Sequence, residues 1–184
     1  MRRALRSRAD GGPGYRLRGF TLFELIVVIC IVSVMAGLLL NRLHVYQEAA
    51  EKASMQQTAA AIKSALQLRV ASYLINGRDN DIEGLRNVNP VSLLQEKPAE
   101  YAGEFYADAY TRVRPGSWYF DAAQRELVYV LNLAANFRPG RDGRNWVRYR
   151  VKIEYEAVPA PEGGPPNKML SAVGFAPVQP YAWF

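Results

Sequence analysis

The feature that most constrains this chain is a membrane-length apolar run near its N-terminus. From Phe20 to Leu40 the run is interrupted only by Thr21, Glu24 and Ser33. An α-helix rises about 1.5 Å per residue, so a helix over this run is roughly 30 Å long, which matches the hydrocarbon thickness of a bilayer. The run therefore predicts a transmembrane helix, and a plain single-pass anchor is its simplest interpretation.

The positive charge of the chain is concentrated before this run. The formal net charge is +6, yet the segment ahead of Phe20 holds six arginines against the single acid Asp10. The remaining residues are almost neutral, so the basicity does not by itself indicate a nucleic-acid-binding protein. By the positive-inside rule, the N-terminus stays in the cytoplasm and the rest of the chain is exported. We therefore expect a single-pass membrane protein whose larger part is exported.

Glu24 is the unusual residue of the run. No Lys or Arg occurs from Phe20 to Asn41. An unpaired carboxylate near mid-bilayer costs roughly 2.5 kcal/mol or more, so a partner is expected. If the chain were cut after Gly19, the new amine on Phe20 would lie one helical turn from Glu24, on the same face. That amine, from the same copy or from a neighbouring one, is a candidate partner.

Residues 19–25 read GFTLFEL. This segment resembles the class III signal of type IV pilins and type II secretion pseudopilins, which has the core Gly-Phe-Thr-Leu-x-Glu-Leu. The resemblance implies cleavage between Gly19 and Phe20 by the prepilin peptidase, and methylation of the Phe20 amine. It also implies assembly into a filament in which Glu24 contacts other subunits, supported by an inner-membrane assembly platform.

The helical pattern continues beyond the apolar run. Apolar side chains recur mostly at spacings of three and four, which predicts one apolar stripe formed by Val45, Met55, Ala59, Ile62, Leu66, Val70 and Tyr73. Glu48 and Lys52 are four residues apart and are predicted to pair on another face. Asn76 and Gly77 predict the end of the helix. We expect a leader over 1–19, a membrane helix over 20–43 and an amphipathic helix over 44–76.

The rest of the chain, 77–184, predicts a β-rich head. Residues 78–115 are irregular, with one short helix starting at Asn89 and stopped by Lys97-Pro98. The runs 117–121 and 126–132 predict a hairpin, and 146–156 alternate between apolar and polar residues with one buried and one solvent-exposed face. A last short strand is expected at 172–175. The predicted class is α+β, a long N-terminal helix packed on a small antiparallel sheet.

The sequence offers little chemistry for an enzyme. Its single histidine is His44, and its single cysteine is Cys30, inside the apolar run. The chain therefore lacks the histidines and cysteines that catalytic triads, zinc clusters and disulfides require. Residues 79–84 imitate the start of a calcium loop, but its twelfth position would be Pro90 instead of Glu. We therefore predict no catalytic, metal or cofactor site and interpret 79–84 as a solvated turn.

Several alternatives stay open at this point. The apolar run also resembles a secretory signal peptide, although it is longer than such segments and contains an acid. The row Arg148, Arg150 and Lys152 beside Trp146 is a candidate DNA contact, but Glu154 continues the same face, so a solvated strand is favoured and nucleic acid is not expected. A membrane-anchored binding or adhesive module that never polymerises is the alternative function. The N-terminal motif serves pili and secretion systems equally, and the missing disulfide argues against a major pilin.

Overall fold

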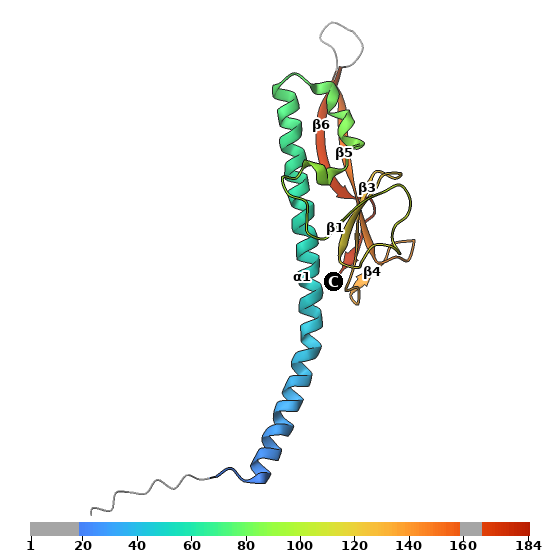
Figure 1. Ribbon diagram of the computed structural model, residues 1–184. Coiled ribbons are helices and arrows are strands. Elements are labelled where there is room, and N and C mark those ends of the chain that lie inside the picture. Colours follow the sequence, from blue (N-terminus) through green and yellow to red (C-terminus); the bar gives the residue numbers. More distant parts are fainter. Residues whose placement is uncertain (1–18, 159–166) are drawn as a thin grey trace, which may run out of the picture. The chain divides into compact units, whose positions relative to one another are not determined.

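The computed structural model describes residues 19–158 and 167–184 (Figure 1). Contacts between Cα atoms divide the chain into two units, 1–42 and 43–184. The helix α1, Leu22–Ile75, runs through both units. The first unit contains the apolar run, and the second contains the remainder of α1 together with every strand.

The end of α1 is set by its last residues, as the sequence predicted. Gly77 has a φ of +63°, in the left-handed region that glycine enters without steric cost. Its N–H donates to the carbonyl of Leu74 (3.2 Å), and the N–H of Arg78 donates to the carbonyl of Tyr73 (2.8 Å). These two bonds form a Schellman motif, which satisfies carbonyls that the helix would otherwise leave unpaired.

The head is built on a five-stranded sheet in the order β1-β2-β3-β5-β6. The central hairpin pairs β2, Ser117–Asp121, with β3, Glu126–Val130, and the next strand is β5, Trp146–Val158. The outer strands are β1, Tyr101–Phe105, parallel to β2, and β6, Asn167–Pro177, antiparallel to β5. A separate two-stranded sheet pairs β4, Phe137–Arg138, with β7, Ala182–Trp183. The α+β prediction is confirmed.

The main core lies between α1 and one face of the sheet. The helix contributes Met55, Ala59, Ile62, Leu66 and Val70, all buried. Opposite them are apolar side chains of β2, β3, β5 and β6, including Trp118, Phe120, Leu127, Tyr129, Tyr149, Val151, Ile153 and Phe175. The prediction that the helix stripe packs on the sheet is therefore confirmed. Val45 was wrongly included in that stripe, because it is 47% exposed.

The other face of the sheet carries a second, smaller cluster. Tyr119, Val128 and Val130 lie beneath Ala109 and Val113 from the segment between β1 and β2. With both faces of the sheet covered, every residue of β3 is buried. The sequence of β3 does not reveal this, because it looks like an ordinary hairpin strand. The expectation of one buried and one solvent-exposed face holds for residues 150–153 of β5. Residues 146–149 are buried or half-buried on both faces, and from Glu154 onward both faces are exposed.

Three predicted boundaries were wrong. The segment 78–115 contains β1, which was missed because Ala102, Gly103 and Glu104 are residue types depleted in strands. The last long strand, β6, spans eleven residues instead of four, since pairing with β5 extends it in both directions. The helix after Asn89 is only the 3₁₀ turn η3, Pro90–Leu93, and ends before Lys97. Its predicted cap is present, because Asn89 Oδ1 accepts the N–H of Val91 at 3.0 Å.

Candidate assembly site

The N-terminal motif forms the start of α1. Gly19 and Phe20 precede the helix, and Thr21 caps it. The Thr21 hydroxyl accepts the N–H of Glu24 at 3.2 Å, and the Thr21 carbonyl accepts the N–H of Leu25 at 3.1 Å. Thr followed three residues later by Glu is the sequence of a capping box, so the motif specifies where the helix begins.

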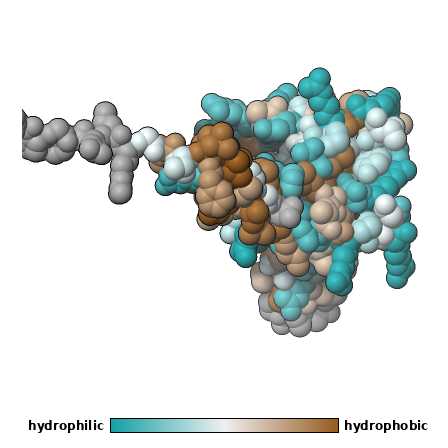
Figure 2. Space-filling model, turned by 90° about the horizontal axis from the view of Figure 1, so that it is seen from below, coloured by the Kyte–Doolittle hydropathy of each residue, from teal (hydrophilic) through white to brown (hydrophobic). Residues whose placement is uncertain are grey.

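The helix that follows is apolar and uncovered. Residues 20–40 are all exposed, with Phe20, Leu22 and Phe23 more than two-thirds accessible. Within the described residues, α1 is the one helix long and apolar enough to cross a membrane, and its most apolar window has a mean hydropathy of 2.8. Figure 2 shows hydrophobic side chains crowded on this helix, whereas hydrophilic side chains are spread over the head. A continuous apolar surface of this size needs lipid or protein to cover it.

Gly19 and Phe20 precede α1, whereas Glu24 lies inside it, so the predicted approach of the Phe20 amine to Glu24 stays a prediction. Glu24 lies in the first turn, where a carboxylate interacts favourably with the positive end of the helix dipole. Among the described residues, the Glu24 side chain makes no hydrogen bond or ion pair, and the bond to Thr21 is made by its backbone N–H.

Glu48 anchors the second unit and was misassigned from sequence. It is 2% exposed, and its carboxylate accepts three hydrogen bonds, from Trp183 Nε1 (2.8 Å), Asn136 N (2.9 Å) and Asn136 Nδ2 (2.8 Å). The predicted pair with Lys52 does not form, because the Lys52 ammonium donates to the Trp183 carbonyl at 2.5 Å. The helix stripe that packs on the head therefore begins with a carboxylate, which hydrophobic periodicity cannot reveal.

Glu51, one turn further along α1, repeats this arrangement. Its carboxylate accepts the N–H groups of Asn132 (2.7 Å) and Leu133 (2.9 Å) and the hydroxyl of Tyr129 (3.0 Å). Together, Glu48 and Glu51 bind the backbone of the loop between β3 and β4. Hydrogen bonds to these two helix carboxylates thus replace the hydrogen bonds that the loop would otherwise make to water.

Burial and hydrogen bonding oppose each other at Glu48. Burial disfavours the charged carboxylate, but the hydrogen bonds from Asn136 and Trp183 outweigh it, so the pKa of Glu48 is lowered from its ordinary value of 4.5. A pKa that is lower in the folded than in the unfolded state stabilises the fold above the unfolded value. That contribution is lost as the pH falls below about 4.5 and through the folded-state pKa.

Replacing Glu48 with Gln is expected to lower the free energy of unfolding at pH 7 by about 1–3 kcal/mol, because the amide group faces three donors with one acceptor. The difference between wild type and variant should shrink as the pH is lowered below 4.5. Urea unfolding of residues 43–184 at several pH values measures both effects. Glu96→Gln, at an exposed position, is the control. A pH-independent difference would contradict a charged Glu48.

The basic row of β5 is largely neutralised within the head. Glu126, which is 2% exposed, pairs with Arg150 at 2.5 Å and with Arg148 at 3.4 Å. Asp142 lies 3.7 Å from Arg148 as well. Two of the three basic side chains are thus held against buried or half-buried carboxylates, which disfavours an extended nucleic-acid contact along this strand.

The acidic side chains of segment 79–84 pair with neighbouring arginines. Asp81 pairs with Arg78 and Glu83 with Arg86, each at 2.6 Å, within two short 3₁₀ turns, η1 (Asp79–Asp81) and η2 (Glu83–Arg86). Among residues 19–158 and 167–184, no cluster of three acidic, histidine or cysteine side chains is arranged to hold a metal ion.

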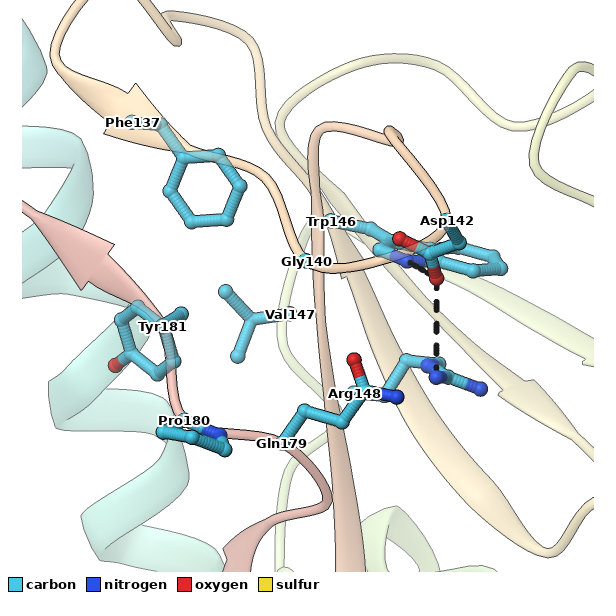
Figure 3. A pocket seen from close by; sticks show the side chains of 9 residues that line it. All are labelled: Phe137, Gly140, Asp142, Trp146, Val147, Arg148, Gln179, Pro180 and Tyr181. Atoms are coloured by element: carbon cyan, nitrogen blue, oxygen red, sulfur yellow. Dashed lines mark hydrogen bonds and ion pairs between the residues drawn. The ribbon is translucent and has the colours of Figure 1, made fainter.

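A small cavity lies between the loop after β4 and the C-terminal segment (Figure 3). On one side the Asp142 carboxylate accepts the indole N–H of Trp146 at 2.8 Å and faces Arg148, and on the other side lie Phe137 and Tyr181. The volume is about 20 Å³, which is room for about one water molecule. The cavity therefore fits no organic substrate or cofactor.

An uncovered apolar N-terminal helix and an α+β head packed on the rest of α1 define a helix-anchored protein with a folded head. A curated relative, the type II secretion system core protein G of Pectobacterium carotovorum subsp. carotovorum, is 32% identical over 145 residues, which are 74% of this chain and 88% of the relative. The chain therefore belongs to the type IV pilin and type II secretion pseudopilin family. No family model matched the sequence, and no solved structure matched it.

Proposed function

We propose that this protein is a structural subunit of a type II secretion pseudopilus or a related type IV pilus. The observation that carries the proposal is the GFTLFEL segment, which opens an uncovered apolar helix in a chain related to a secretion-system core protein. The relative's name favours the secretion system. The proposed role is assembly and not catalysis.

In this proposal the leader, residues 1–19, is removed by the prepilin peptidase, and the amine of Phe20 is methylated. The helix over 20–43 is first held in the inner membrane with the head in the periplasm. An assembly platform then moves it into a filament, where neighbouring helices cover the apolar surface that lipid covered before. The helix over 44–76 and the head over 77–184 form the outer part of the subunit.

Glu24 gives the incoming subunit its register. A carboxylate in lipid is costly, and the amine of Phe20 in a neighbouring copy offers a cation that cleavage has created. Pairing between copies thus stabilises a subunit inserted into the filament relative to a subunit that remains free in the bilayer. Within residues 19–158 and 167–184 no side chain competes for the Glu24 carboxylate, which supports this role.

Replacing Glu24 with Gln is expected to reduce crosslinking to other pilin or pseudopilin subunits about tenfold or more, while leaving export, cleavage and head folding unchanged. Gln keeps the side-chain shape and can occupy the same capping-box position, so the helix start is preserved. Crosslinking and co-purification from the native host measure the effect.

Ser33→Ala is the matched control, because it also changes a polar residue of the apolar helix, one whose hydroxyl only donates to the carbonyl of Ile29 (2.7 Å). Undiminished assembly of the Glu24→Gln protein would exclude the pairing mechanism. Loss of assembly in both variants would assign the effect to the helix itself and not to the charge.

A further inference from the structure

A separate concentration of positive charge lies where the turn between β2 and β3 meets β5. A surface cavity of about 330 Å³ is lined by three arginines, Arg86, Arg125 and Arg150, together with Ala123, Gln124 and Val151. The arginines come from three segments, η2, the turn and β5. Guanidinium groups present planar sets of N–H donors that match carboxylate and phosphate oxygens. We propose that this arginine cavity binds an oxyanion, a phosphate or a carboxylate group, supplied by another molecule.

Two of the arginines are fixed by the backbone around the cavity. Arg86 donates to the carbonyl of Ile153 on β5, and its Nε lies 2.6 Å from Glu83 Oε1. Arg150 donates to the carbonyl of Gln124 in the turn, at 3.4 Å. Side chains already held in place lose little freedom when a ligand binds, which favours binding.

The charges around the cavity do not balance. Glu126 pairs with both Arg150 and Arg148, and Asp142 also lies 3.7 Å from Arg148, so these two acids offset the two arginines of β5. Arg125 forms no hydrogen bond or ion pair with any residue that the structure describes. Since Arg86 is offset by Glu83, the charge of Arg125 is the one that remains without a paired acid at the cavity among the described residues. A bound oxyanion would neutralise it.

Arg125 occupies a position where the turn itself favours another residue. Its φ is +55°, in the left-handed region that glycine adopts freely and arginine does not. The turn is already organised by Asp121, whose carboxylate accepts the N–H groups of Ala123 and Gln124, each at 3.0 Å. The arginine side chain thus has no role in forming the turn. Strained non-glycine residues concentrate at functional sites, which favours a binding role for this arginine.

The arginine cavity is independent of the N-terminal motif, so it can be tested without filament assembly. The test follows the unfolding midpoint of the full chain in neutral detergent micelles by tryptophan fluorescence. Inorganic phosphate and citrate are titrated against sodium chloride of equal ionic strength. A ligand that binds only the folded state raises the midpoint. Phosphate or citrate is expected to raise it saturably, and the more effective of the two tells which oxyanion the cavity prefers.

Arg125→Gly separates binding from folding. Glycine suits the left-handed turn, so the midpoint without anion should be unchanged or higher, while the affinity for phosphate or citrate should fall at least about tenfold. Arg141→Gly is the matched control, because it removes the same charge from another exposed loop. If the glycine variant does not fold, Arg125→Asn, which also tolerates this conformation, replaces it.

Equal shifts with chloride and with both oxyanions would overturn the proposal, because they would show general screening of charge. It would also be overturned if the Arg125→Gly chain bound as tightly as wild type, or if Arg141→Gly weakened binding to the same degree. Selective loss at Arg125 would establish the site.

Discussion

Replacing Gly19 with valine is expected to leave the chain at its full length in the membrane, with little or no product that begins at Phe20. In the proposed mechanism the peptidase must accept the residue before the cut, and a β-branched side chain obstructs it there. The expected loss of mature protein is at least about a hundredfold. Intact-mass analysis of protein from a host with the prepilin peptidase measures it, and wild type should show a Phe20 start with one added methyl group.

The structure makes this variant unusually informative. A Cβ atom added at Gly19 would meet nothing within 4 Å, and the residue does not have a positive φ. The fold therefore has no need of glycine at this position. Gly37→Val is the control, because it makes the same change at a second uncrowded glycine of the apolar helix. Normal cleavage of the Gly19→Val chain would exclude the proposed processing site. A mature start near Gly37 would instead favour a secretory signal peptide.

Replacing Leu66 with alanine is expected to lower the free energy of unfolding of the head by about 2–5 kcal/mol. Leu66 is completely buried in the cluster between α1 and the sheet. Its truncation removes apolar contacts and leaves a cavity that the surrounding strands cannot fill without moving. Urea unfolding of residues 43–184, followed by the fluorescence of the buried Trp118 and Trp183, measures the loss.

Leu68→Ala is the matched control. Leu68 lies two residues further along the same helix but is 73% exposed, so its replacement should change stability by less than about 0.5 kcal/mol. Equal effects of the two variants would mean that α1 does not pack on the sheet through the predicted face.

Much of the fold could be predicted because it depends on local patterns. The stripe from Met55 to Val70 has the helical period, and the alternation along β5 has the strand period. Each pattern identifies an apolar face that must be buried, and the simplest way to bury both faces is to pack one against the other. The end of α1 was predictable for the same reason, since Asn76 and Gly77 act within one turn of the chain.

The candidate assembly site also depends on a local pattern, and its role stays a prediction. Gly19, Phe20 and Glu24 lie within six residues, so the sequence alone identifies the motif and its place at the start of the apolar run. The structure adds that Thr21 caps this helix and that Glu24 has no side-chain partner in the described part of the chain.

Only the tertiary structure decided which charged residues are buried and paired. Glu48 looked like an exposed partner of Lys52, but the donors that bury it come from Asn136 and Trp183, 88 and 135 positions away. The sequence did not predict an acidic partner for the basic row of β5, whereas the fold places Glu126 beside Arg148 and Arg150.

The arginine cavity likewise joins three segments that no local pattern relates. Periodicity reports which side of a helix or strand faces inward, because it depends on neighbours in sequence. It does not report what lies opposite that side, since this depends on strand order and on loops that close over long separations. The sequence by itself thus determined the helix, the assembly motif and the class of the fold. The tertiary structure alone decided the polar contacts that hold the head on the helix and the charge that the head leaves unpaired.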